Sequence, residues 1–116
     1  MPNYSSSLDK VFQALADQTR LGMVESLAGG PASVKELGRP LAMSLPAVMQ
    51  HLQVLEAAGL VRSQKAGRVR TCQIEPTALR TAEDWIVGQR TAWERRLDRL
   101  GDYLAEDPEH EPGSTS

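Results

Sequence analysis

The stretch that decides the fold is SLPAVMQHLQVLEAAGLV, residues 44–61, because it contains a whole helix with both of its ends. Ser44 is a favoured N-cap residue, and Pro46 lies in the first turn, where a missing N–H removes no helical hydrogen bond. Gly59 ends the helix after Ala58. The apolar residues that recur at helical spacing predict one buried face, formed by Val48, Leu52 and Leu55.

A second, shorter helix precedes this one. Ser33 and Glu36 have the spacing of a capping box, and a turn at 42–43 separates the two helices. Two helices joined by a tight turn, the second presenting small and amide side chains, are typical of a helix-turn-helix that enters a major groove. The alternative is an ordinary helical hairpin. The residues predicted to contact DNA from this helix are Ser44, Pro46, Ala47, Met49, Gln50, His51 and Gln53.

The side chains of this set suit different contacts. Gln50 is the best candidate for a paired hydrogen bond to adenine, and Ala47 or Met49 for contact with a thymine methyl group. Met49 has partial burial in the core as its alternative, since methionine often fills gaps. His51 is expected to pack at the helix edge or to touch a phosphate rather than to read a base.

A short β-hairpin is predicted after the helix, with strands over 60–65 and 68–74 around Ala66-Gly67. Residues 62–70 carry four cations and no acid, a charge of +4 in a chain whose net charge is −2. A run of charge is often only a solvated face, but beside a recognition helix it indicates a DNA-binding wing. The residues assigned to phosphates are Arg62, Lys65, Arg68 and Arg70, with Arg68 nearest the tip and able to reach a minor groove.

Helices are also predicted at both ends of the chain. Apolar spacing predicts one over 6–16 and another over 18–28 that Asp17 caps, with Leu21, Val24 and Leu27 inward. From Pro76 a long helix with nearly heptad apolar spacing is too apolar for one small domain, so a second copy should cover it. The residues expected at the dimer interface are Leu8, Val11, Phe12, Leu79, Ile86, Trp93, Leu97 and Leu100.

Length and composition limit the remaining possibilities. The 116 residues suit one mostly α-helical domain, over 6–105, followed by an acidic, flexible tail over 106–116. Aromatic residues are only 4%, which favours helix packing over a large sheet. There is no signal peptide and no apolar run long enough to span a bilayer, so we expect a cytoplasmic protein with no membrane partner. No constellation of catalytic side chains is present, so an enzyme is not expected.

Two stretches resemble the ArsR/SmtB family of bacterial repressors: ALADQTR at 14–20 and the decisive stretch at 44–61. The resemblance covers about residues 6–105 and implies a dimeric winged helix-turn-helix, a homodimer joined through its first and last helices, and release of double-stranded DNA by an effector. Met49 stands where the family commonly has serine, and Gln53 where a basic residue is frequent. Base preference and phosphate affinity therefore do not transfer from the family.

The effector is left open by the sequence. Metal sensing in this family uses cysteine pairs or His/Asp clusters, and the chain offers neither, so no metal and no cofactor are expected. The alternative is a metal site completed by carboxylates of the tail. A small-molecule effector is one possibility, and Trp85 and Trp93 form either interface packing or an aromatic-lined pocket for it. The single cysteine, Cys72, allows only a bridge to a second copy. The alternative function is a winged-helix module that binds another protein instead of specific DNA.

Overall fold

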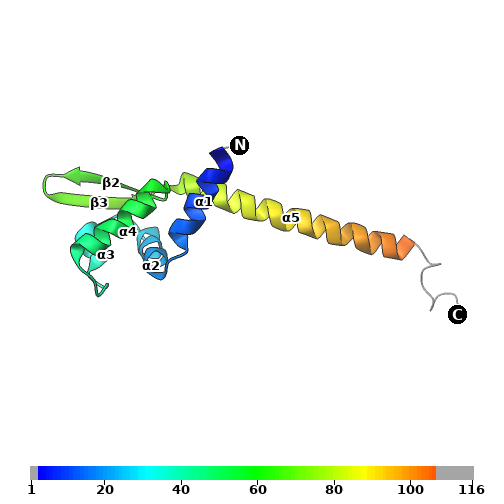
Figure 1. The fold of residues 1–116 in the computed structure, drawn as a ribbon, viewed down its shortest axis with the longest axis horizontal. Coiled ribbons are helices and arrows are strands. Elements are labelled where there is room, and N and C mark those ends of the chain that lie inside the picture. The colour runs from blue at the N-terminus through cyan, green and yellow to red at the C-terminus, as the bar shows by residue number, and fades with distance from the viewer. Residues whose placement is uncertain (1–2, 107–116) are drawn as a thin grey trace. The chain divides into compact units, whose positions relative to one another are not determined.

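A computed structural model describes residues 3–106 of the chain (Figure 1). Its helices and strands follow the order that the sequence predicts, with one strand added. Contacts divide the chain into two units, with the boundary between Ala82 and Glu83, and the two are described separately below. The elements in chain order are α1 Asn3–Leu15, α2 Gln18–Ala28, β1 Ala32–Ser33, α3 Val34–Gly38, α4 Leu45–Ala57, β2 Val61–Ala66, β3 Val69–Ile74 and α5 Pro76–Glu106.

The predicted signals at the helix ends are confirmed. The Asp17 side chain accepts a hydrogen bond from Arg20 N and caps α2, and Ser33 and Glu36 form the full capping box at the start of α3. The first helix begins at Asn3, earlier than predicted, and ends one residue sooner, at Leu15. Boundaries of this kind depend on weak end signals and shift by one or two residues easily.

The first unit packs its helices and a small sheet around one apolar core. Helices α1, α2 and α3 all contact α4, and the sheet contacts α2, α3 and α4. In α2 the predicted Leu27 is buried and Val24 packs against the core. Leu21, also predicted to face inward, is 44% exposed, and Met23 is buried instead. The buried apolar residues are Leu8, Val11, Ala14, Met23, Leu27, Val34, Leu37, Val48, Leu52, Leu55, Leu60, Val61, Cys72 and Ala82.

The sheet has three antiparallel strands in the order β1-β3-β2. Strand β1 is absent from the sequence prediction, because two residues are too few to show an alternating pattern; Ala32 pairs with Cys72 and Ser33 with Thr71. This pairing fixes the start of α3 against the hairpin. The hairpin turns at Gly67, whose φ of 64° is a conformation that glycine adopts without a steric penalty.

The second unit consists of the C-terminal part of α5. This helix runs without a break over 31 residues, and from Glu83 to Glu106 its side chains are almost all exposed within the single chain. No helix within residues 3–106 is long and apolar enough to cross a membrane. The predicted tail lies outside the described residues except for Glu106, which belongs to α5.

Candidate nucleic-acid interface

Helix α4 begins where its sequence requires. Ser44 adopts an extended backbone conformation, with φ −71° and ψ 158°, and its Oγ accepts a hydrogen bond from the Ala47 N–H at 3.4 Å. Pro46 sits in the first turn. Val48, Leu52 and Leu55 are at most 2% exposed, so one face of α4 is anchored in the core. The opposite face is thereby held outward.

Six of the residues predicted to lie in a major groove share this outward face. They line one hollow of about 560 Å³, made by Ser44, Pro46, Ala47, Met49, Gln50 and Gln53. Gln50 and Gln53 are exposed. Met49 is half-buried. It packs against the core and also lines the hollow, so its position is compatible with both predicted roles, partial burial and contact with a base.

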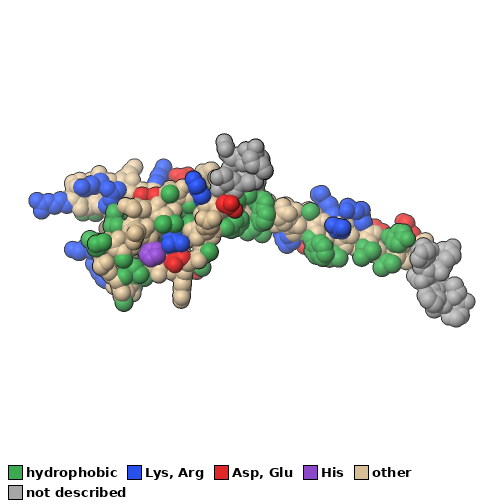
Figure 2. Space-filling model, viewed as in Figure 1, with side chains coloured by type: hydrophobic (Ala, Val, Ile, Leu, Met, Phe, Trp, Pro, Cys, Tyr) green, Lys and Arg blue, Asp and Glu red, His purple; other side chains and the backbone are tan. Residues whose placement is uncertain are grey.

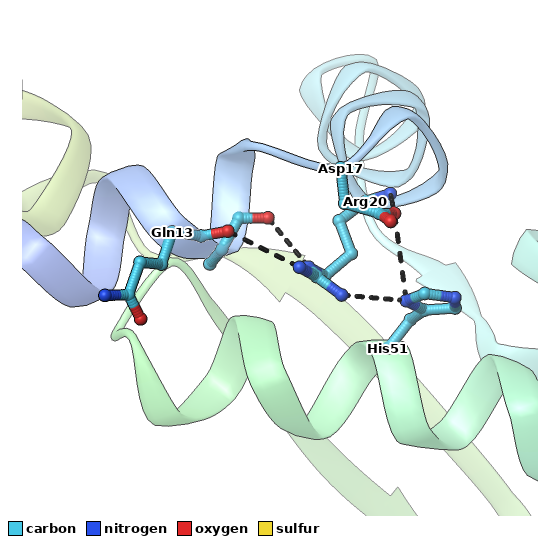
Figure 3. Close-up of polar contacts among 5 residues, drawn as sticks. Gln13, Asp17, Arg20 and His51 are labelled. Carbon is cyan, nitrogen blue, oxygen red and sulfur yellow. Dashed lines mark hydrogen bonds and ion pairs between the residues drawn. The ribbon is translucent and has the colours of Figure 1, made fainter.

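His51 lies apart from that face. Its Nδ1 is 3.1 Å from the Arg20 guanidinium and 3.9 Å from an Asp17 carboxylate oxygen (Figure 3). Because a guanidinium only donates, Nδ1 accepts this hydrogen bond, and the neutral ring carries its proton on Nε2. Arg20 also donates through Nε to the Ala14 carbonyl at 2.8 Å and through Nη2 to that of Gln13 at 3.4 Å.

These contacts make Arg20 a clamp between α4 and the junction of α1 with α2. Its guanidinium joins backbone from the end of α1 to a side chain in the middle of the recognition helix (Figure 3). Sequence reasoning did not assign this role, although Asp17 and Arg20 both lie in the ALADQTR stretch. Spacing alone does not reveal it, because Arg20 and His51 are 31 residues apart.

Asp17 is stabilised in its charged form at this junction. The backbone N–H of Arg20 donates to its carboxylate at 3.0 Å, and this hydrogen bond lowers the pKa of Asp17, with the charge of Arg20 acting in the same direction. The carboxylate is also at the N-terminus of α2, where a negative charge is favoured.

The four cations assigned to the wing fall into two pairs. Arg62 lies at the base of the hairpin, where it forms a 3.5 Å ion pair with Glu75, and Arg70 donates to Ser63 Oγ at 3.0 Å. Lys65 and Arg68 lie at the tip, are exposed and form no ion pair within residues 3–106. Figure 2 shows basic side chains gathered over this hairpin.

A series of polar side chains ties the hairpin to α4. Ser63 donates to the Glu56 carboxylate and accepts from Arg70, so a residue near the end of the recognition helix is connected to both strands. No sequence signal indicates this connection, since an isolated serine and glutamate form no motif. Its effect is to fix the hairpin relative to α4.

Cys72 is buried in the middle of the sheet. It is 0% exposed, and burial raises the pKa of its thiol, with the charge of Glu56 adding to the effect. A disulfide to a second copy would require the sheet to open. Within residues 3–106 no three His, Cys, Asp or Glu side chains gather as a metal site would need, and His110 lies outside that range.

The residues expected at the dimer interface fall into a buried group and an exposed group. Leu8 and Val11 are 6% and 2% exposed and belong to the core of their own chain, so they offer no surface to a second copy. Leu79 packs against the same core, and Phe12 is 37% exposed. In the second unit Ile86, Trp93, Leu97 and Leu100 are all about half exposed.

Comparison with known proteins identifies the same architecture. Residues 15–64 match a family described as a helix-turn-helix domain. The chain is 47% identical over 106 residues to the HTH-type transcriptional regulator Rv2034 of Mycobacterium tuberculosis, and the match covers 88% of this chain and 98% of that protein. This identity and coverage indicate that the two proteins share one fold over most of their length.

Solved structures agree with this assignment. The crystal structure of the ArsR family transcriptional regulator RHA00566 superposes with a TM-score of 0.76 at 45% identity, over 81% of this chain and 97% of that one. The homodimeric winged helix-turn-helix DNA-binding domain of Mb0332 from Mycobacterium bovis superposes with a TM-score of 0.58 at 27% identity, over 79% and 90%. Relatives of this kind are transcriptional regulators, which are not enzymes. The chain belongs to the ArsR/SmtB family of winged helix-turn-helix transcriptional regulators.

Proposed function

We propose that this regulator is a homodimeric repressor that binds double-stranded DNA at an imperfect palindrome and is released by an effector other than a metal ion. The observation that carries the proposal is the outward face of α4, where six side chains of suitable chemistry line one hollow beside a hairpin whose tip cations have no acidic partner within residues 3–106. A buried opposite face holds them in place.

In this proposal α4 enters the major groove. Gln50 forms two hydrogen bonds to the N6 and N7 atoms of adenine, and Ala47 or Met49 contacts a thymine methyl group. Lys65 and Arg68 bind the phosphate backbone, with Arg68 near enough to the tip to enter a minor groove. The other two cations of the hairpin already have partners within the chain, so their part is to hold the hairpin rather than to supply most of the affinity.

The proposed dimer uses the C-terminal part of α5. Its apolar side chains lie seven, four, three and four residues apart and therefore share one face of the helix. Figure 2 shows hydrophobic side chains recurring along one edge of this helix. An exposed apolar stripe is costly in water, and a second copy would cover it. The homodimeric relative Mb0332 supports the same assembly. The stripe consists of Ile86, Trp93, Leu97, Leu100 and Leu104.

A dimer of this kind determines the form of the operator. Two recognition helices related by a two-fold axis enter successive major grooves, about 34 to 36 Å apart along the duplex. Repression then follows from occupancy, since a protein bound across a promoter excludes the transcription machinery. The clamp at Arg20 supports this by fixing the orientation of α4 against the junction of α1 and α2.

A binding titration tests the proposal. Purified protein is titrated against labelled DNA from its own upstream region and against a scrambled duplex, at two salt concentrations, with and without added Zn²⁺ or Ni²⁺. We expect tight, salt-dependent binding that prefers the upstream DNA and is unchanged by metal. Binding to neither duplex at either salt concentration would refute DNA recognition and favour the protein-interaction module. Release by metal would refute the proposed class of effector.

A further inference from the structure

A second hollow, of about 540 Å³, lies beside the recognition face. It is an open hollow lined by the start of α3, the first turns of α4 and both strands of the hairpin, and it shares only Met49 with the hollow on the outward face of α4. All of these elements belong to the first unit. The proposed DNA contacts use Met49, Lys65 and Arg68 from its lining and leave Val34, Leu45 and Val69 without a role.

Part of the lining of this hollow is apolar. This part, called the floor, consists of Val34, Leu45, Met49 and Val69, which come from three different elements. Leu45 is 57% exposed and Val69 is 53% exposed, whereas Val34 is buried in the core. Apolar side chains that gather from separate elements into one concave surface are typical of a ligand site, whereas isolated exposed ones are ordinary.

The rest of the lining, called the rim, is basic. Four cations and no carboxylate line it, and none of the four forms an ion pair within residues 3–106. One of them, Arg70, donates a hydrogen bond to Ser63 Oγ. Cations gathered without acids create a positive potential that attracts an anion. The lining cations are Lys35, Lys65, Arg68 and Arg70.

A DNA phosphate would interact with the cations of this hollow but not with its apolar side chains. It can pair with the rim, but it is hydrated and has no apolar part to cover Leu45 or Val69. A ligand that satisfies both parts has one anionic group for the rim and an apolar body for the floor. Charge and floor together therefore identify an amphipathic organic anion.

We propose that this hollow is an effector site for an amphipathic organic anion, and that the bound anion competes with DNA for Lys65 and Arg68. Only the competition with DNA rests on the proposed DNA-binding function. Binding of the anion to the hollow needs no DNA. Since both ligands use the same cations, each lowers the apparent affinity of the other. The effector thus acts within the DNA-binding unit and requires no motion of α5.

Decanoate is a simple probe of the site. Its binding to the full chain is measured by calorimetry at fixed ionic strength, beside acetate, which has the charge without the chain, and decyltrimethylammonium, which has the chain with the opposite charge. We expect decanoate to bind one per chain, and each control to bind at least about tenfold more weakly, because each lacks one of the two contributions. Equal binding of decanoate and decyltrimethylammonium would overturn the proposal.

A matched pair of double variants locates the site. Leu45→Ala with Val69→Thr removes apolar floor without changing charge, and both positions are more than half exposed, so the fold should persist. We expect decanoate affinity to fall about tenfold, as several buried carbon atoms lose contact. Leu21→Ala with Val54→Thr makes the same changes at exposed positions outside the hollow and should leave the affinity unchanged. Equal affinities in the two double variants would overturn the assignment.

Competition is measured by anisotropy of labelled upstream DNA. Decanoate should release the DNA, whereas acetate at the same concentration should not, and the Leu45→Ala/Val69→Thr variant should need about tenfold more decanoate. DNA that stays bound while decanoate occupies the hollow would overturn the competition. A chain that binds decanoate in the hollow but no DNA would retain the site and refute the proposed function, so the two failures are distinguishable.

Discussion

The side chains of the candidate DNA interface differ in whether they already have a partner within the chain. Gln50 and Gln53 are exposed on the outward face of α4, and Lys65 and Arg68 stand at the hairpin tip without an ion pair in the described part of the chain. Arg62 is held by Glu75 at the hairpin base. This arrangement implies a division of roles, in which the amides read bases and the tip cations supply affinity that is independent of sequence.

Two single substitutions separate these roles. Gln50→Ala should change the preferred base at one operator position, with a loss of about 1–3 kcal/mol of discrimination there. Arg68→Ala should weaken binding to specific and random DNA alike and reduce the salt slope by about 1. Gln64→Ala, an exposed amide on the hairpin, is the matched control for Gln50. Equal losses on both kinds of DNA from the Gln50 and Arg68 substitutions would contradict the division.

The Asp17 cap predicts a dependence of stability on acid. Its pKa is lowered in the folded state, so its ionised form stabilises the fold above the ordinary value of 3.8, and this contribution is lost as the pH falls through the folded value. Asp17→Asn keeps a capping oxygen but no charge. We expect a lower Tm than wild type at pH 7 and a difference that shrinks toward pH 3, as followed by circular dichroism. A difference that does not vary with pH would refute the role of the charge.

At the scale of elements, the contact between α3 and α4 sets the geometry of the recognition helix. A Cβ at Gly38 would lie 3.1 Å from Val48 Cγ2, and Val48 is only 1% exposed. Glycine at 38 therefore lets the two helices approach closely. A side chain there would push α3 away from α4.

Gly38→Val tests this contact. Overpacking should lower the free energy of unfolding by about 1–3 kcal/mol, measured by urea denaturation. Gly22→Val is the control, because a Cβ at Gly22 meets nothing within 4 Å, and its effect should stay within about 0.5 kcal/mol. If the two variants lose the same stability, the close approach of α3 and α4 is not what position 38 provides.

Much of the fold could be predicted because its helices carry their own end signals. Ser33, Ser44 and Asp17 cap the helices that they were expected to cap, and the apolar face of α4 is buried as predicted. Strand β1 could not be predicted, because its pairing with β3 is long-range and only two residues long. Helical spacing indicated Val24 and Leu27 correctly in α2 but was wrong for Leu21, where tertiary packing buries Met23 instead.

The candidate site was predictable only in part, for a related reason. Residues on one helix face share a periodicity, so the outward residues of α4 could be grouped from sequence. The Arg20 clamp and the Ser63 bridge to Glu56 join residues from different elements and leave no periodic trace. Burial of Leu8 and Val11 in their own chain likewise depends on how α1 packs, which spacing does not specify.

At the scale of the whole molecule, the proposed dimer depends on the apolar stripe of α5. Leu97→Glu places a charge in the middle of that stripe and should convert the dimer to a monomer, because an unpaired charge is costly to bury. Light scattering at micromolar concentration should then give half the wild-type mass. Ala92→Glu adds the same charge at an exposed position about 140° from Leu97 around the helix and should leave a dimer. A wild-type protein that is itself monomeric would contradict the assembly.

Selection of DNA from a random library by the wild-type protein tests the central claim most directly, because the operator sequence does not have to be identified first. A homodimer that reads bases with α4 should enrich an imperfect palindrome whose half-site centres are about 10–10.5 base pairs apart, or a multiple of that spacing. Enrichment of a motif without two-fold symmetry would contradict the dimer. No enrichment over the starting library would contradict sequence-specific recognition by the outward face of α4.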